Sequence, residues 1–217
     1  AKTNGDTLSS GKFAIIGGTS DGSINTWGGS NSVYIGTPNY SGGTIAWAAT
    51  DNFPTGIIRS TMNVLPDGRM LVLGGYNGAN MSTAYFGTIS LIDDSVSWTS
   101  GTPMPAGKSM HASTVLKDGR ILTTGGNTAS VLTDICYIGA IDSDTISWVT
   151  TSPLPYIAEG HTLVTLHDGR VAFIGGYSTS VSYSPRVYIG TVTGNTVAWA
   201  LCTASMPDSR TGHMTTV

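Results

Sequence analysis

The stretch from His161 to Gly176, HTLVTLHDGRVAFIGG, contains the pattern that decides the fold. Two runs rich in β-branched and apolar residues, 161–166 and 170–174, have no helical period and predict β-strands. Asp168-Gly169 between them is a strong hairpin signal, and we expect a type I′ turn with positive φ at both residues. The second strand then ends at the double glycine Gly175-Gly176. The stretch therefore predicts two antiparallel strands joined by a tight turn.

This pattern occurs four times in the 217 residues, and three independent markers keep one spacing. The double glycines are separated by 57, 51 and 50 residues, and the tryptophans by 51, 50 and 51. Between each double glycine and its tryptophan lies a short aromatic segment that ends in glycine. A constant period of this length indicates a repeat architecture. The double glycines are Gly17-Gly18, Gly74-Gly75, Gly125-Gly126 and Gly175-Gly176; the tryptophans are Trp47, Trp98, Trp148 and Trp199; the aromatic segments end at Gly36, Gly87, Gly139 and Gly190.

Each unit is predicted to contain four strands. The aromatic segment forms the third strand, and the segment with the tryptophan, such as 196–200, forms the fourth. No stretch of ten or more residues carries a 3.6-residue apolar period, so the protein is predicted to be all-β. A four-stranded sheet cannot bury both of its faces alone. The units are therefore expected to pack face to face around an axis, as a β-propeller.

The double glycine after the second strand, the tyrosine of the third strand and the tryptophan of the fourth together resemble the kelch repeat. In kelch units the first strand lines the propeller axis, so the resemblance implies four four-stranded blades around one axis. Tyrosine and tryptophan are 13, 13, 11 and 11 residues apart, which is longer than usual in kelch units, so these units are kelch-like and divergent. The segment with Tyr-Ile-Gly-Thr and Thr-Val-Ala-Trp is also similar to repeats in bacteriophage tail and fibre proteins.

The two ends of the chain allow two ways of completing the first blade. Residues 211–217 repeat the beginning of a first strand, and we favour pairing of this segment beside Phe13, which would close the ring. In the alternative, residues 3–8 supply the first strand of blade one, and the C-terminal segment begins a fifth blade of a larger wheel or of a ring shared by two chains. The favoured arrangement is a single domain with blade 1 at 11–58 plus 211–217, blade 2 at 59–109, blade 3 at 110–159 and blade 4 at 160–210.

Composition excludes several classes of function. Charged residues are 11% of the chain, against roughly 25% in an average soluble domain, and the net charge is −3. Without a basic surplus, nucleic acid is not an expected partner. No apolar run approaches the ~20 residues that span a bilayer, so neither membrane insertion nor a signal peptide before Ala1 is expected. Neutral surfaces rich in Ser, Thr, Asn and Gly are common on secreted and virion proteins, so we expect an extracellular or virion-surface location.

Three histidines share the repeat position at the start of the first strand, where the remaining copy has Ser60. Three imidazoles near one axis could bind a transition metal with an open coordination position, as in a catalytic zinc site. The favoured interpretation is structural: each histidine caps its strand and bonds to the backbone of a neighbouring blade. We therefore expect no metal and no cofactor, with the low-ranked metal candidates being His111, His161 and His213.

Other repeated residues have structural interpretations as well. The basic residues after the turn glycines are interpreted as solvated hairpin residues, with a cationic ring for an acidic ligand as the alternative; they are Lys12, Arg69, Arg120 and Arg170. The repeated tryptophans are interpreted as core between blades, with sugar stacking as the alternative. Cys136 occupies an apolar strand position and is expected to be a buried free thiol, whereas Cys202 follows a fourth strand and is expected to be partly exposed.

The sequence contains no nucleophile elbow, paired-carboxylate motif, phosphate loop or calcium loop, and Glu159 is its only glutamate. We therefore expect a protein that is not an enzyme. The loops after the second and fourth strands share one face of a propeller, and such loops normally carry recognition. The expected function is recognition of a glycan or protein receptor by Trp27, which lies outside the repeat, together with Arg59, Asn77, Asn80, Tyr156, Tyr177 and Arg210.

Two alternatives stay open at this point. The chain could be a structural module of a phage tail, fibre or surface appendage, in which self-association into a homo-oligomer is what matters. It could also be a metal-dependent enzyme built on the histidine ring.

Overall fold

The computed structural model describes residues 4–8, 11–19, 29–90 and 92–216, and the chain is all-β in these ranges. Its main strands form four antiparallel four-stranded sheets, which we call units 1 to 4. Unit 1 contains β1 (Asn4–Thr7), β2 (Phe13–Ile16), β3 (Val33–Asn39) and β4 (Thr44–Ala49). Unit 2 contains β5 (Thr61–Val64), β6 (Met70–Leu73), β7 (Ala84–Ile89) and β8 (Val96–Ser100).

Units 3 and 4 have the same strand order and each carries one extra small hairpin. Unit 3 contains β9 (Ala112–Val115), β10 (Ile121–Thr124), β13 (Cys136–Asp142) and β14 (Thr145–Thr151), with β11 (Asn127–Thr128) and β12 (Val131–Leu132) in the loop after its second main strand. Unit 4 contains β15 (Thr162–Thr165), β16 (Val171–Ile174), β19 (Val187–Thr193) and β20 (Thr196–Leu201), with β17 (Tyr177–Ser178) and β18 (Ser182–Tyr183) in the same loop. Among the described residues, no helix is long and apolar enough to cross a membrane.

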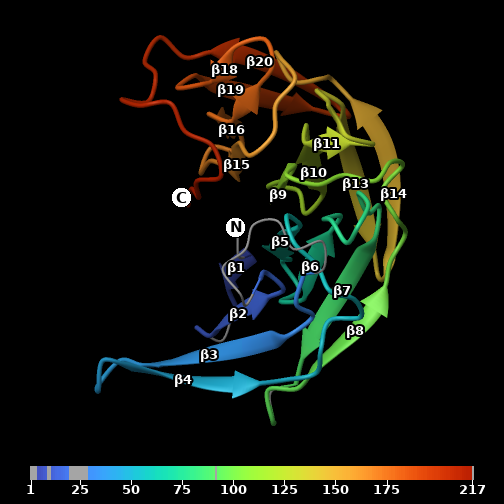
Figure 1. The fold of residues 1–217 in the computed structure, drawn as a ribbon, viewed down its shortest axis with the longest axis vertical. Coiled ribbons are helices and arrows are strands. Elements are labelled where there is room, and N and C mark those ends of the chain that lie inside the picture. The colour runs from blue at the N-terminus through green and yellow to red at the C-terminus, as the bar shows by residue number, and fades with distance from the viewer. Residues whose placement is uncertain (1–3, 9–10, 20–28, 91, 217) are drawn as a thin grey trace.

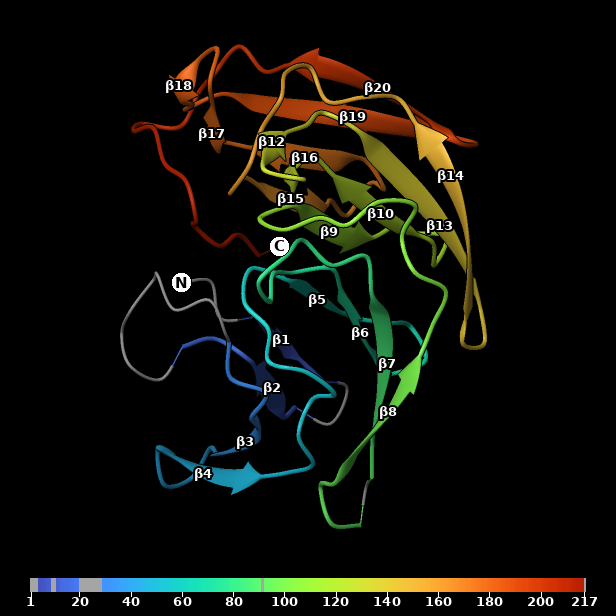
Figure 2. The same ribbon diagram turned by 45° about the vertical axis from the view of Figure 1, so that its right-hand side comes forward.

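The four sheets stand side by side in an arc (Figure 1). Strands β1, β5, β9 and β15 are innermost and neighbour one another in that order, while β4, β8, β14 and β20 lie on the outside. The arc is open between unit 1 and unit 4, and the same opening is visible after a 45° turn (Figure 2). Because the strands alternate in direction, the loops after the second and fourth strands share one side of the arc. We call this side the loop face and the opposite side the turn face.

The favoured ring closure is wrong. Strand β1 pairs with β2 in the register Asn4↔Ile16 to Thr7↔Phe13, so the inner position of unit 1 is already filled by the N-terminal segment. Strand β2 pairs with β1 on one edge and β3 on the other, which leaves no edge for residues 211–217. The described part of that segment, Thr211–Thr216, instead runs beside β15 without forming a ladder. The alternative interpretation of the chain ends describes the first sheet correctly.

The turn prediction is also wrong in type. In each Leu-x-Asp-Gly-Arg turn the glycine has positive φ, for example +89° at Gly169, whereas Asp168 does not. The amide of Gly169 donates to the carbonyl oxygen of Leu166, and the amide of Leu166 donates to the carbonyl oxygen of Arg170. This is a type I turn followed by a left-handed glycine, the usual three-residue hairpin connection. The Asp168 carboxylate accepts from the Arg170 amide at 3.0 Å, which stabilises this form.

The core lies between adjacent sheets, in three apolar clusters at the 1–2, 2–3 and 3–4 interfaces. Each sheet has a leading face, which carries the fourth-strand tryptophan toward the preceding sheet. It also has a trailing face, which carries the residue before the third-strand glycine toward the following sheet. In the 2–3 interface, the trailing face contributes Leu73 and Phe86, and the leading face contributes Ile121, Ile146 and Trp148. The predicted role of the tryptophans as inter-sheet core is confirmed for Trp98, Trp148 and Trp199.

Backbone geometry explains why both positions of each double glycine are occupied by glycine. Both residues of each pair have positive φ, as at Gly74 (+59°) and Gly75 (+105°). A Cβ on Gly74 would lie 2.8 Å from Cε1 of His111 in the next unit. The amide of Gly75 donates to the carbonyl oxygen of Lys108, which also belongs to the segment leading into unit 3. The pair therefore lets one sheet end against the backbone that begins the next.

Candidate functional site

The repeated histidines hold adjacent units together. Nε2 of His111 contacts the Thr61 hydroxyl at 3.2 Å, and Nε2 of His161 contacts the Thr124 hydroxyl at 2.9 Å, each hydroxyl belonging to the preceding unit. Nε2 of His213 contacts Thr162 of unit 4 in the same way, at 3.2 Å. We expected each histidine to bond to the backbone of a neighbouring unit, whereas these three contacts reach a threonine hydroxyl group of that unit. Within the described part of the chain, no group of three or more His, Cys, Asp or Glu side chains is placed to hold a metal ion.

A chain of backbone hydrogen bonds runs around the inner strands at the loop face, one residue before the histidine position. The Met110 amide donates to the carbonyl oxygen of Arg59 at 3.0 Å, the Gly160 amide to Met110 at 2.8 Å, and the Gly212 amide to Gly160 at 2.7 Å. All four residues have positive φ, between +53° and +67°. Gly160 and Gly212 adopt this conformation without strain, whereas Arg59 and Met110 adopt it with full side chains.

Arg59 and Tyr76 lie together at the loop face, where the chain enters the inner strand β5. The Arg59 guanidinium lies 6.0 Å from the centre of the Tyr76 ring, within reach of a cation–π contact. Tyr76 is held there by a bridge between its backbone and Ile58. The same bridge recurs in the next two units, as Ser109↔Asn127 and Glu159↔Tyr177. The residue after each double glycine is therefore fixed beside the segment that leads into the next inner strand.

Three of the other predicted site residues lie on the loop face. The exposed Asn77 donates from Nδ2 to the Thr55 hydroxyl at 2.9 Å. Asn80 donates from Nδ2 to Oδ1 of Asn127 at 3.1 Å, joining the loops of units 2 and 3. Tyr177 packs against the exposed Tyr183 across the β17–β18 hairpin, with ring centroids 5.2 Å apart.

The remaining predicted residues are placed differently. Tyr156 lies in the 3–4 interface against Phe173 and donates its hydroxyl to the carbonyl oxygen of Gly175 at 3.0 Å, so its ring is a packing element. Arg210 is exposed beside Asp208, with 3.6 Å between nitrogen and oxygen. Trp27 lies outside the described residues. The structure thus brings Arg59 together with Tyr76 and Asn80 with Asn127, but it does not bring all the predicted residues to one point.

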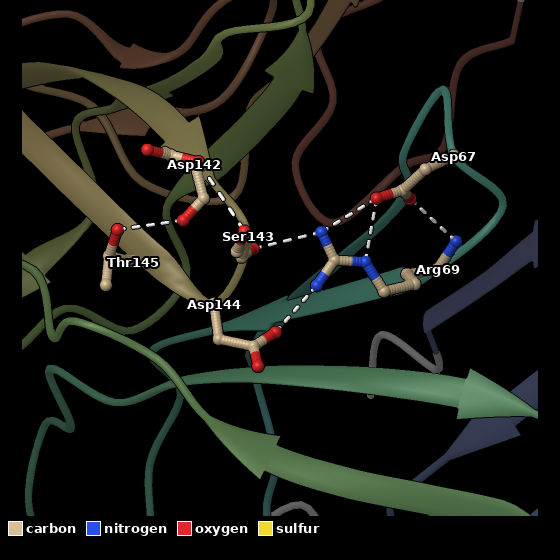
Figure 3. A network of polar contacts seen from close by, with 6 residues as sticks. All are labelled: Asp67, Arg69, Asp142, Ser143, Asp144 and Thr145. Atoms are coloured by element: carbon tan, nitrogen blue, oxygen red, sulfur yellow. Dashed lines mark hydrogen bonds and ion pairs between the residues drawn. The ribbon is translucent and has the colours of Figure 1, made fainter.

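The turn face carries a second set of inter-unit contacts, which the sequence analysis interpreted as solvated side chains. Arg69 donates from Nε to Asp67 in its own turn, from Nη1 to Asp144 at 2.7 Å, and from Nη2 to the carbonyl oxygen of Ser143 at 2.9 Å (Figure 3). Asp144 and Ser143 belong to the β13–β14 hairpin of the following unit. The guanidinium also lies over the Phe86 ring at 4.7 Å. The solvated interpretation is wrong for Arg69, because its side chain links two units.

The same contact recurs at two other turns. Arg120 donates to the carbonyl oxygen of Gly194 and to Oδ1 of Asn195, in the β19–β20 hairpin of unit 4. Lys12 pairs with Asp94 in the β7–β8 region of unit 2. The hydrogen bond from Arg120 lowers the pKa of the Asp118 carboxyl group, against a smaller opposing effect of burial. These networks make Lys12, Arg69 and Arg120 connections between units, whereas Arg170 is an exposed turn residue, as predicted.

Lys108 is a buried cation that the sequence analysis did not single out. Its Nζ donates to the carbonyl oxygens of Gly125 and Ile135, both at 2.8 Å, and lies 5.2 Å from the Tyr137 ring centre. Burial lowers its pKa to about 8. The neighbouring Cys136 is a buried free thiol, as predicted, and burial raises its pKa to about 12. A buried thiol that stays protonated at neutral pH is a poor nucleophile, which favours a packing role for Cys136.

The fold has a solved counterpart. The solved structure of YjhT superposes on this chain with a TM-score of 0.68 and 17% sequence identity, covering 97% of this chain and 67% of that chain. At this identity the likeness concerns the fold alone. No family model matches the sequence, and no curated protein matches it.

The loop-face residues that the sequence analysis missed are Met110, Tyr76 and Asn127. One signal could have found Met110: Arg59 and Met110 align with Gly160 and Gly212 in the repeat. A position that is glycine in some copies often has positive φ, and a large residue there is a candidate for function. Tyr76 and Asn127 directly follow the double glycines and could have been chosen on that ground alone.

Proposed function

We propose that the four sheets are blades of a kelch-like β-propeller. The repeated double glycine, tyrosine and tryptophan support this, as does the order of the inner strands β1, β5, β9 and β15 around a common centre. In this arrangement the loop face is one end of the propeller, and its centre is the place where the inner strands begin.

We propose further that the protein is a non-catalytic recognition module that binds a carbohydrate at the centre of the loop face, outside the cell or on a virion. The observation that carries this proposal is the left-handed backbone at Arg59 and Met110. A non-glycine residue costs about 1 kcal/mol in this conformation, and such strain concentrates at binding sites. The equivalent glycines, Gly160 and Gly212, indicate that the fold itself does not need these side chains.

The chemistry around Arg59 suits a sugar. The half-buried guanidinium has a planar set of donors, the Tyr76 ring lies beside it, and the Asn77 and Asn80 amides lie in the loop that follows. A flat ring with donors around it can stack on one face of a pyranose and bind its hydroxyl groups. A protein loop is the alternative ligand, because the same groups occur in protein-binding surfaces.

Substitution of Arg59 by glycine separates binding from stability. Arg59→Gly removes the side chain and relieves the left-handed strain, so the melting temperature is expected to stay equal or rise while glycan-array binding falls at least tenfold. Arg170→Ala, on the turn face, is the matched control and is expected to bind like the wild type. Wild-type binding by Arg59→Gly would contradict the site, and an array without any wild-type signal would contradict a carbohydrate ligand.

A further inference from the structure

Within the described ranges, each of the two end sheets presents a face that no other sheet covers. The leading face of unit 1, which we call the leading end face, comprises Phe13, Ile15, Tyr34, Ile45 and Trp47. The trailing face of unit 4, which we call the trailing end face, comprises Leu166, Ile174 and Ile189, with Met206 and Arg170 at its rim. The two sheets that carry these faces, units 1 and 4, border the opening of the arc in Figure 1. The exposure of each residue on these faces can be compared with that of the equivalent residues in the other units, where the same face is covered.

On the leading end face, Ile45 is 47% exposed, whereas its equivalents Val96, Ile146 and Val197 are between 1% and 3% exposed. Trp47 is 51% exposed, although the other three repeat tryptophans are half-buried. Phe13 packs edge-on against Trp47 with ring centroids 5.1 Å apart, so the two rings form one surface. An apolar face whose counterparts are all buried indicates an interface rather than a solvated surface.

The trailing end face differs from its counterparts in the same way. Leu166, Ile174 and Ile189 are half-buried, whereas Leu65, Leu73 and Phe86 of unit 2 are at most 4% exposed. Arg170, at the rim of the trailing end face, is likewise more exposed than its counterpart Arg69. The Arg170 side chain is 51% exposed and pairs only with Asp168 among the described residues. The Arg69 side chain is 20% exposed, because the next hairpin supplies Asp144 and a carbonyl oxygen. Arg170 thus lacks the acidic or amide hairpin that its counterparts bind.

The C-terminal segment already occupies the inner position of a following unit. His213 contacts the Thr162 hydroxyl at 3.2 Å, as His111 contacts Thr61, and Thr215 contacts the same hydroxyl at 2.7 Å. The Gly212 amide donates to Gly160, as the Met110 amide donates to Arg59. A second copy of this chain would bring its own β1 to this occupied place. A repeat segment that starts at its second strand would complete the sheet without conflict.

We propose that the two end faces are the interfaces for two further units of this same repeat, which close the arc into a ring of six. The first added unit uses Thr211–Thr216 as its inner strand and offers a hairpin to Arg170. The second covers Trp47 with its trailing face. The number two is supported by YjhT, in which the unmatched third of the chain is half as long as the part matched by four units. This inference rests on the propeller arrangement, and not on the ligand.

A direct test extends the full chain after Val217 with a second copy of residues 116–210. Val217 aligns with Val115, so the extension adds strands two to four of unit 3 and all of unit 4 in register. In the extended chain, hydrogen–deuterium exchange of Thr211–Thr216 and of β4 is expected to slow at least tenfold. Binding of an apolar dye is expected to fall severalfold, and the extended chain is expected to remain a monomer. A matched extension with Ile189→Asp in the appended copy is expected to keep the protection at 211–216 and to lose it at β4.

Unchanged exchange in both segments would overturn the proposal. Protection at 211–216 alone in the unaltered extension would overturn the ring of six. If the extended chain does not fold, the double variant Ile45→Ser/Trp47→Ser of the 217-residue chain tests whether the leading end face is a free interface. The proposal expects less dye binding and a melting temperature within about 2 °C of the wild type, and large destabilisation would contradict a free interface. None of these measurements involves a ligand, so they are independent of the glycan-array result.

Discussion

Ile45 and Ile146 are the same residue at the same repeat position, yet one is half exposed and the other is 3% exposed. Both lie on a fourth strand, and both face the direction of the preceding sheet. Ile146 packs against that sheet, and its amide donates to the hydroxyl oxygen of Thr102, just after β8, at 3.0 Å. Ile45 has no preceding sheet to meet. The difference shows that burial in this protein is a property of a pair of units, which a single unit does not determine.

The largest expected effect comes from truncating each of the two isoleucines in a separate variant. Ile146→Ala should destabilise the protein by ~2–5 kcal/mol, because it leaves a cavity inside the 2–3 interface. Ile45→Ala should change the free energy of unfolding by less than about 1 kcal/mol, because much of this side chain is already in water. Chemical denaturation of both variants measures the difference. Equal losses would show that the leading end face is packed in solution.

A second test uses Lys108 and Arg210, whose carbonyl groups occupy equivalent places as acceptors for Gly75 and Gly176. Lys108 is buried and Arg210 is exposed. Burial holds the Lys108 pKa at about 8, whereas it returns to 10.5 on unfolding. Between these values the unfolded chain binds the extra proton, so this group makes stability rise as pH increases from about 8 to about 10.

The measurement is the denaturation midpoint as a function of pH in the wild type and in Lys108→Met. In the variant, stability should increase less between pH 8 and 10 than in the wild type, because the contribution of Lys108 is absent. Arg210→Met is the matched control and should keep the wild-type profile. A rise of the same size in Lys108→Met would mean that the lysine is not desolvated in the folded chain.

The smallest expected effect concerns the turn-face arginines. Arg69→Ala should cost about 1–2 kcal/mol, because it removes charge-assisted hydrogen bonds to two units and packing on Phe86. Arg170→Ala should cost less than about 0.5 kcal/mol, because it removes one exposed ion pair within a turn. Thermal unfolding at low and high salt measures both, and the Arg69 contribution should shrink in high salt. A loss at Arg170 as large as at Arg69 would contradict this account.

The strands and their order were predictable from the sequence, because they depend on local patterns. The β-branched runs, the Asp-Gly turn and the double glycine place β15 and β16 within one or two residues of the observed bounds, whereas the favoured first strand of unit 1 was wrong. The buried thiol of Cys136 followed from its alignment with apolar positions in other copies. In each of these cases the necessary information lies within one unit of about 50 residues.

The contacts between units were not predictable in the same way. Residues 211–217 resemble a first strand equally well whether they complete unit 1 or begin another unit, and only the pairing of β1 with β2 decides. Arg69 has the local sequence of an exposed turn residue, but the length of the next hairpin brings Asp144 to it. For the candidate site, Arg59 was predicted from its loop position, whereas its backbone strain became visible only in the structure.

The three interfaces join only neighbours in the sequence: unit 1 with 2, 2 with 3, and 3 with 4. None of these three interfaces has to wait for a partner from a distant part of the chain. During synthesis each newly emerged sheet can therefore cover the apolar side of the one made just before it, and growth can proceed from the N-terminus in steps of one repeat. At every stage the leading end face of unit 1 stays uncovered, and the other uncovered side moves forward with the growing end, where the next sheet will arrive.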